Sequence, residues 1–295
     1  MQHRRTWFVT GCSSGLGRAM AEALVASGHN AVITARRVEQ IKDLESKAPD
    51  RILALPLDIS DEKMVFDAIA QATSRFGRVD VIVNNAGVGL IGSLEECSYA
   101  EIDQVFRTNV HGTLNVVRAV LPQMRERGDG CVITMSSIGG VRAGPGLSAY
   151  NASKFALEGF MESLDHEVSQ FGIKVIILEP GAFRTDFRVK SIARSEKVLP
   201  AYASTSGKRR EGIEAGYPPE AGDPAQAAQL ILKLADMEDP PLRLPIGADC
   251  VSALKKKLEY TTRELARWEH LSISCGGSES AMANHAEAIA GSKRK

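Results

Sequence analysis

The 295-residue sequence has no excess of charge of either sign, because it contains 36 Lys and Arg residues and 36 Asp and Glu residues. A chain without net charge has no long-range field that attracts nucleic acid or an anionic membrane surface. We therefore expect neither nucleic acid nor a membrane as a partner. Any site for an anion has to be built locally.

Long hydrophobic runs are also missing. The apolar stretch after Arg4 and Arg5 breaks at Thr10 and Gly11, which is too early for a signal-peptide core or a membrane span. The five cysteines form no CxxC pair and no His stands at metal-ligand spacing, so we interpret the cysteines as reduced thiols and expect no metal site. These absences predict a cytoplasmic protein.

Short apolar runs rich in β-branched residues alternate with segments of helical period. The runs have the character of buried strands and lie at residues 7–9, 31–33, 52–57, 79–83, 131–135, 175–178 and 242–246. The helical segments include residues 18–27, 62–76, 99–127 and 152–171. Parallel strands need crossover connections, which cover both faces of the sheet. The sequence therefore predicts an α/β protein of the Rossmann type, a single domain with a doubly wound seven-stranded parallel sheet.

A glycine-rich turn, TGCSSGLGRAM, follows the first predicted strand and contains Gly11, Gly15 and Gly17. Glycine permits positive φ and close backbone approach, so that amides at a helix N-terminus can face a pyrophosphate. The spacing differs from the common GxGxxG pattern, and a tight connection without a ligand is the alternative interpretation. The position at the carboxyl end of a first strand, where such sheets bind ligands, favours a dinucleotide.

The end of the second predicted strand indicates which dinucleotide. NAD-binding folds usually place a carboxylate there to hold the ribose, but this sequence reads Thr34-Ala35-Arg36-Arg37. A guanidinium group suits bidentate contact with a 2′-phosphate. We therefore expect NADP(H) in preference to NAD(H), and the alternative is that both arginines open a solvated helix.

Three further motifs carry hydroxyl, amine and amide groups. Tyr150 and Lys154 are four residues apart in SAYNASKFALEGF, so that both side chains project from one helix face. Ser137 ends the strand CVITM, where its hydroxyl would point into the cofactor crevice, and Asn109 lies in TNVHG within the predicted helix 99–127. A surface pair is the alternative interpretation of Tyr150 and Lys154.

Together with NNAG (84–87) and PGAFRT (180–185), these motifs give the chain a close resemblance to the short-chain dehydrogenase/reductase family over roughly residues 6–246. TGCSSGLG and YNASKFALEG are similar to the 17β-hydroxysteroid and retinol dehydrogenase branch. The resemblance implies a catalytic tetrad of Asn109, Ser137, Tyr150 and Lys154. It also implies cofactor contacts from Gly11, Ser13, Ser14, Gly15, Leu16, Arg36, Asp58, Ile59, Asn85, Ala86, Gly87, Tyr150, Lys154, Pro180, Gly181 and Thr185.

The chemistry explains these residue types. Hydride delivery to a carbonyl carbon leaves negative charge on the oxygen, which has to be protonated as it forms. Tyr150 would donate that proton, and the ammonium of Lys154 would lower the tyrosine pKa from its usual ~10. Ser137 would orient and polarise the substrate oxygen. By resemblance, Asn109 would hold a water that links Lys154 to solvent.

Residues 183–222 interrupt the strand and helix rhythm with many Arg and Lys residues. The apolar residues between them suit a lid over a small hydrophobic carbonyl or alcohol substrate, and they are Phe183, Phe187, Val189, Ile192, Val198, Leu199, Tyr202 and Ile213. A solvated loop and an acidic substrate are the alternatives. We expect residues 1–270 to form the NADP(H)-binding domain, with the lid inside it, and residues 271–295 to form a flexible tail.

Apolar residues on the predicted helices 99–127 and 152–171 are more numerous than one buried face needs. The resemblance implies a two-fold interface there, in a homodimer or homotetramer. The alternative is that the sheet buries them all. Two other functions share this scaffold. An epimerase or dehydratase would need a larger C-terminal domain, and a nucleotide-sensing regulator without turnover would lack part of the tetrad.

Overall fold

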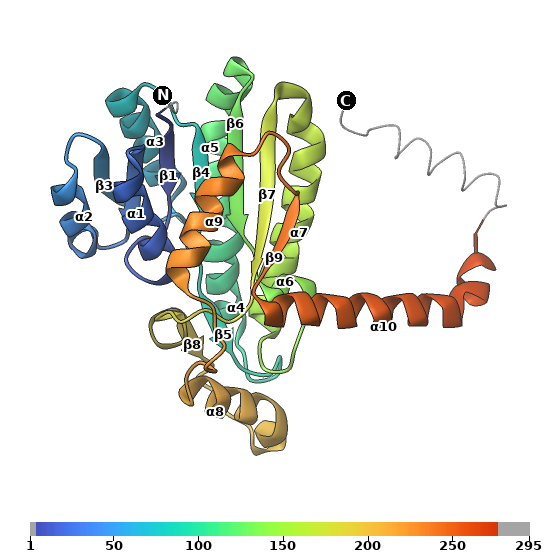
Figure 1. Ribbon diagram of the computed structural model, residues 1–295. Helices are drawn as coiled ribbons and strands as arrows, with labels where there is room; N and C mark the ends of the chain where they lie inside the picture. Colours follow the sequence, from blue (N-terminus) through green and yellow to red (C-terminus); the bar gives the residue numbers. More distant parts are fainter. Residues whose placement is uncertain (1–3, 277–295) are drawn as a thin grey trace.

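A computed structural model describes residues 4–276, and its centre is a sheet of seven parallel strands (Figure 1). Their order is β3-β2-β1-β4-β6-β7-β9. The strands are β1 (Thr6–Val9), β2 (Asn30–Ala35), β3 (Ile52–Pro56), β4 (Val81–Asn84), β6 (Gly130–Met135), β7 (Ile173–Pro180) and β9 (Arg243–Ile246). The predicted seven-stranded parallel sheet in a single domain is therefore confirmed.

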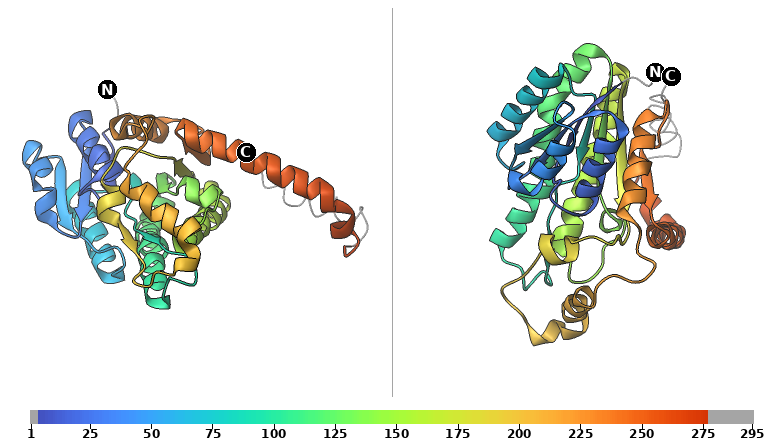
Figure 2. Two further views of the ribbon diagram at one scale, coloured as in Figure 1. Left: turned by 90° about the horizontal axis from the view of Figure 1, so that it is seen from below. Right: turned by 60° about the vertical axis from the view of Figure 1, so that its left-hand side comes forward.

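Helices cover both faces of this sheet (Figures 1 and 2). One face carries α1 (Gly15–Ser27), α2 (Lys42–Lys47) and α9 (Pro224–Asp236), and the other carries α3 (Glu62–Phe76), α5 (Gly112–Arg127) and α7 (Ser148–Val168). The two apolar cores follow from strand geometry, because successive side chains point to opposite faces. Trp7 and Val9 enter the first core, whereas Phe8 enters the second.

The predicted helix over residues 99–127 is present but is not a regular α-helix throughout. It consists of α4 (Tyr99–Phe106), a π-helical turn over Arg107–His111 labelled η2, and α5. A π turn widens the helical ladder by one residue and often occurs at a functional site. Asn109 lies inside this turn.

A second, two-stranded sheet was not predicted. It pairs β5 (Gly89–Ile91) with β8 (Ile192–Arg194) in parallel, and so joins the predicted lid to the segment that follows β4. An isolated parallel β-bridge between Phe183 and Gly222 also joins the two ends of the predicted lid. The short helices are η1 (Val38–Gln40), α6 (Ile138–Val141), η3 (Ser169–Phe171), η4 (Phe187–Ser191), η5 (Pro200–Tyr202), η6 (Ala203–Gly207) and α8 (Lys208–Glu214).

The last described helix, α10 (Ala248–Ile273), projects away from the sheet (Figures 1 and 2). It runs past residue 271, where we expected the tail to begin, and residues 277–295 of that predicted tail lie outside the described residues. Among residues 4–276, no helix combines the length and the apolar character that crossing a membrane requires.

Candidate active site

A cavity of about 470 Å³ lies where β1, β2, β4, β6 and β7 end. All of the predicted cofactor contacts line this cavity, and so do Ser137, Tyr150 and Lys154. Asn109 is the one predicted site residue that does not line it. The cavity is therefore where the topology of a doubly wound sheet places a ligand.

The glycine turn between β1 and α1 has a backbone that only glycine fits. Gly11 and Gly15 have φ values of 73° and 59°, and a Cβ on Gly17 would lie 2.2 Å from the carbonyl oxygen of Gly11. The Ser14 side chain makes no capping hydrogen bond at the start of α1, which leaves amides at this helix N-terminus available to an anion. The turn therefore fits a pyrophosphate.

Asn85 and Thr10 hold this turn in place. The Asn85 Nδ2 atom donates to the carbonyl oxygens of Thr10 at 2.9 Å and Gly11 at 3.1 Å. The Thr10 Oγ1 atom accepts hydrogen bonds from the backbone amides of Asn85 and Ala86, each at 3.0 Å. Sequence reasoning placed Asn85 beneath the nucleotide and missed Thr10. Their hydrogen bonds show that both residues brace the turn.

Two polar side chains lie at the end of the cavity formed by β2 and β3. Arg36 follows β2 and is exposed on the cavity lining, which does not include Arg37. Asp58 follows β3, and its Oδ1 atom accepts from the amide and hydroxyl of Ser60 at 2.9 and 2.7 Å. The Arg36 guanidinium is thus a charged hydrogen-bond donor beside the glycine turn, at the end of the cavity formed by β2 and β3.

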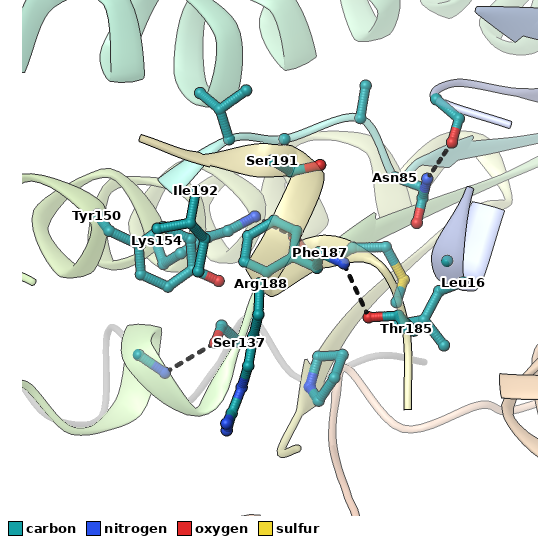
Figure 3. Close-up of a pocket in the computed structure, with 18 of the residues that line it drawn as sticks. Leu16, Asn85, Ser137, Tyr150, Lys154, Thr185, Phe187, Arg188, Ser191 and Ile192 are labelled. Atoms are coloured by element: carbon teal, nitrogen blue, oxygen red, sulfur yellow. Dashed lines mark hydrogen bonds between the residues drawn. The ribbon is translucent and has the colours of Figure 1, made fainter. Parts of the chain in front are cut away.

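Ser137, Tyr150 and Lys154 face the cavity from two neighbouring elements (Figure 3). Ser137 begins α6, and its Oγ atom accepts from the amide of Gly139 at 3.0 Å, which leaves the hydroxyl proton free to be donated. Tyr150 and Lys154 lie one turn apart on α7, with the lysine Nζ atom 5.9 Å from the tyrosine ring centroid. The Nζ atom donates to the carbonyl oxygen of Met135 at 2.7 Å.

Burial shifts the pKa values of both groups. It raises the pKa of Tyr150, an effect that a hydrogen bond from Ser137 opposes. It lowers the pKa of Lys154 to about 8, against the opposing charge of Glu158. We had expected the lysine charge to lower the tyrosine pKa. The direction differs because that expectation did not include the loss of solvent around both groups.

Asn109 is fully buried in the π turn, and its side chain is occupied by protein contacts. Its Oδ1 atom accepts from the amide of Val88 at 2.8 Å, and its Nδ2 atom donates to the carbonyl oxygen of Val88 at 2.8 Å and to Ser153 at 2.9 Å. A Cβ on Gly87 would lie 3.3 Å from the Asn109 Oδ1 atom and 3.7 Å from the Lys154 Nζ atom. Asn109 thus fixes the backbone beside Lys154, and its relay role stays a prediction.

The predicted lid residues divide into two groups. Those that line the cavity are Phe183, Phe187, Ile192 and Ile213. The ring centroid of Phe187 lies 6.1 Å from that of Tyr150. The expected place of the other four in the pocket was wrong, because the lining does not include Val189, Val198, Leu199 or Tyr202. Of these, Val189 and Val198 are 82% and 61% exposed. Arg188 and Arg209 also line the cavity, which the sequence did not predict.

Sequence reasoning also missed Tyr217 and Glu96. The Tyr217 hydroxyl lies 3.1 Å from the Thr185 Oγ1 atom. The buried carboxylate of Glu96 accepts from the amide of Leu199 at 2.9 Å, from Ser206 at 2.6 Å and from Arg210 at 3.0 Å. Glu96 therefore anchors the base of the lid. Glu95 is its neighbour in the sequence, and two adjacent glutamates are usually exposed to solvent. The sequence therefore gave no sign that Glu96 is buried.

A glycine turn, a cavity at the ends of parallel strands and a Tyr150–Lys154 pair define a nucleotide-dependent oxidoreductase. The family model described as short chain dehydrogenase matches residues 5–196. The chain belongs to the short-chain dehydrogenase/reductase family.

Similar proteins agree with this assignment. Oxidoreductase BOA17 of Botryotinia fuckeliana is 36% identical over 92% of this chain and 98% of its own length. Human retinol dehydrogenase 8 is 38% identical over 64% of this chain and 62% of its own length. A solved short-chain dehydrogenase from Streptomyces avermitilis is 45% identical, with a TM-score of 0.86 over 92% of this chain and 100% of its own.

Two more distant solved structures were determined with nicotinamide cofactors. ElxO with NADP bound is 26% identical, with a TM-score of 0.70 over 85% of this chain and 100% of its own. A 3-ketoacyl-(acyl-carrier-protein) reductase from Brucella melitensis, complexed with NADH, is 27% identical. Its TM-score is 0.70, and the match covers 82% of this chain and 96% of its own. A nicotinamide cofactor is therefore supported for this chain.

Proposed function

We propose that this protein interconverts a carbonyl group and a secondary alcohol with NADP(H), and that Tyr150 is the general acid and base. The observation that carries the proposal is the single cavity shared by the glycine turn, Ser137, Tyr150 and Lys154. When bound, the nicotinamide supplies or accepts the hydride. The protein has to hold the substrate oxygen and exchange one proton with it.

Each polar group has a role that follows from its contacts. Because its pKa is raised, Tyr150 keeps its proton at neutral pH and can donate it to the substrate oxygen. Ser137 accepts from Gly139 and lines the cavity beside Tyr150, so its hydroxyl can donate to a substrate oxygen placed there. The Lys154 ammonium stabilises the phenolate that forms when Tyr150 gives up its proton.

The choice of NADP(H) over NAD(H) rests on Arg36. Its guanidinium lines the cavity and is exposed there, as a partner for the 2′-phosphate would have to be. The similar proteins include both NADP and NADH complexes. The residue at the end of β2 is therefore our basis for this choice.

We propose a small hydrophobic carbonyl or alcohol compound as the substrate. The lid contributes Phe183, Phe187 and Ile192 to the cavity, and apolar walls of this kind bind apolar ligands. The relative retinol dehydrogenase 8 is named for a hydrophobic alcohol. Arg188 and Arg209 also line the cavity, and they leave an acidic substituent on the substrate as a second candidate.

We further propose self-association through α5 and α7, and a location in the cytoplasm. On α7, Leu157 and Met161 are buried against the sheet, while Phe155 and Phe160 are 44% and 47% exposed. Apolar exposure of this kind supports an interface. Cys12, Cys131 and Cys250 are buried as free thiols, which suits a reducing compartment.

The first test is Tyr150→Phe, which removes the proton and keeps the ring that packs near Phe187. We expect NADPH affinity to remain and turnover to fall by about 10²-fold or more, the usual scale for a lost general acid. Fluorescence titration of NADPH and steady-state turnover measure the two quantities. Near-normal turnover would refute the proposed role.

A further inference from the structure

Helix α10 leaves the body of the protein after its second turn. Its buried residues, Cys250 and Ala253, lie in those two turns, where the helix contacts α6 and β9. From Lys255 to Cys275 no residue is buried. Figures 1 and 2 show this part of the helix extending alone, away from the rest of the described chain.

Five apolar residues and one Thr follow a heptad repeat along this helix, whereas the exposed Tyr260, Leu271 and Ile273 lie outside it. The residues of the repeat recur at alternating intervals of three and four, which places them along the seam of a two-stranded coiled coil: Val251, Leu254, Leu258, Thr261, Leu265 and Trp268. Leu258, Leu265 and Trp268 are 58%, 61% and 44% exposed. The stripe spans about 26 Å at the usual rise of a helix. Its length and spacing fit a second helix.

The order of residues along the stripe fits an antiparallel copy of the same helix. When Leu254 lies opposite Leu265 of the second copy, every other residue of the stripe also lies opposite a stripe residue of that copy, and each such pair forms one layer of the interface. Val251 then meets Trp268, and Leu258 meets Thr261, in each case of the second copy. Each layer pairs a larger with a smaller side chain or two leucines. The two-fold operation repeats every layer, as an isologous interface requires.

Charges beside the stripe favour the same arrangement. In this antiparallel register Lys257 lies opposite Glu264 of the second copy, and symmetry gives the contact twice. In a parallel pair Glu264 would instead face Glu269 of the second copy, which is a repulsive contact. Among the described residues of one chain, Glu264 has a 4.0 Å ionic contact with Arg267. Basic and acidic residues are nearly balanced along α10, unlike a helix that binds anionic lipid.

We propose that α10 forms an antiparallel coiled coil with α10 of a second copy of this chain. This interface is separate from the cavity and from Phe155 and Phe160 on α7. Together with a two-fold interface at α7 it would assemble a tetramer.

Charge reversal tests the register. We expect Lys257→Glu and Glu264→Lys each to raise the dissociation constant of the α10 interface by about tenfold or more, because each places like charges together twice. The double variant restores opposite charges and should restore the native value. Sedimentation equilibrium of the full chain measures these constants, and NADPH binding checks the fold. Unchanged single variants, or a double variant as weak as the singles, would overturn the proposal.

Leu258→Glu tests the apolar stripe, with Tyr260→Glu as the matched control. The two side chains are 58% and 51% exposed, so neither substitution disturbs the core, and they lie on opposite sides of α10. We expect Leu258→Glu to halve the mass measured by light scattering at micromolar concentration, and Tyr260→Glu to leave it unchanged. A monomeric native protein, or equal effects of both variants, contradicts the pairing. A third result would also contradict the pairing: the native protein binds phosphatidylserine vesicles, and Leu258→Glu abolishes that binding without changing the mass.

Discussion

The balance of pKa effects at Tyr150 and Lys154 determines what each residue can do. A tyrosine with a raised pKa keeps its proton over a wider pH range, whereas a lysine with a pKa near 8 is only partly charged in mildly alkaline solution. In the proposed reaction, carbonyl reduction uses the proton of Tyr150 and the positive charge of Lys154 together. The active protonation state therefore exists below the lysine pKa.

This balance predicts the pH dependence of carbonyl reduction. Because Lys154 loses its charge as the pH rises through about 8, we expect kcat/KM to fall above that pH, approaching tenfold per unit. The profile of kcat/KM reports groups of the free enzyme. Lys154→Arg carries a permanent charge, so the falling limb should move well above pH 8 in that variant, although its turnover is lower. A limb that stays in place would assign the ionisation to another group.

The proposed preference for NADP(H) rests on one residue at the end of β2, Arg36. A charge-assisted contact contributes about 1.5–3 kcal/mol, so we expect NADPH to be favoured over NADH by ~10- to 150-fold. Arg36→Asp should reverse the preference, because the new carboxylate repels the 2′-phosphate and accepts from a ribose hydroxyl. Arg37→Asp is the matched control, since Arg37 does not line the cavity. Equal KM values for both cofactors in the native protein would rule out this role.

Among single residues, those that reach the cavity through a motif at a strand end were predictable from the sequence. Ser137, Asn85 and the glycine turn are examples, because the end of a parallel strand determines where its next residues lie. Thr10 and Glu96 could not be predicted in this way. Their roles come from hydrogen bonds to residues 75 and 110 positions away in the chain, and neither has a local pattern.

At the scale of elements, periodicity predicted the strands of the large sheet and the helices α1, α3, α5 and α7 that cover it, but not α9. It did not predict the π turn at Asn109, because one extra residue in a long helical segment barely changes the apolar pattern. It also missed β5 and β8, which are three residues long and too short to show alternation. These irregular elements are the ones that support Lys154 and the lid.

The predicted lid has a base held by buried contacts and a segment that lines the cavity. Glu96 and Arg210 form a buried ion pair at the base, whereas Phe187 approaches Tyr150 from η4. We expect Phe187→Ala to lower kcat/KM for a hydrophobic ketone by about tenfold or more through lost apolar contact. Val189→Ala, at an 82% exposed position of η4, should have no effect. Stopped-flow measurement of both variants checks this, and equal losses would remove the lid from substrate binding.

At the scale of the whole molecule, the topology places the chemistry. The strand order reverses around β1 and β4, and the connections that leave their carboxyl ends separate to form the crevice. The alternation of strands and helices was enough to predict this arrangement. The direction of α10 was not predictable, because it depends on how its first turns pack against α6 and β9.

In the proposed reaction, a hydride passes between NADPH and a carbonyl carbon while both are bound in this cavity. The most direct measurement is NADPH oxidation with ketosteroids, retinal, 3-oxoacyl thioesters, and aromatic and aliphatic ketones, with the alcohol product quantified in the same reaction. We predict that at least one hydrophobic carbonyl compound is reduced, with one alcohol formed for each NADPH consumed, and that Tyr150→Phe abolishes the reaction. Tight NADPH binding without oxidation by any of these compounds would contradict the account and indicate a nucleotide-sensing regulator.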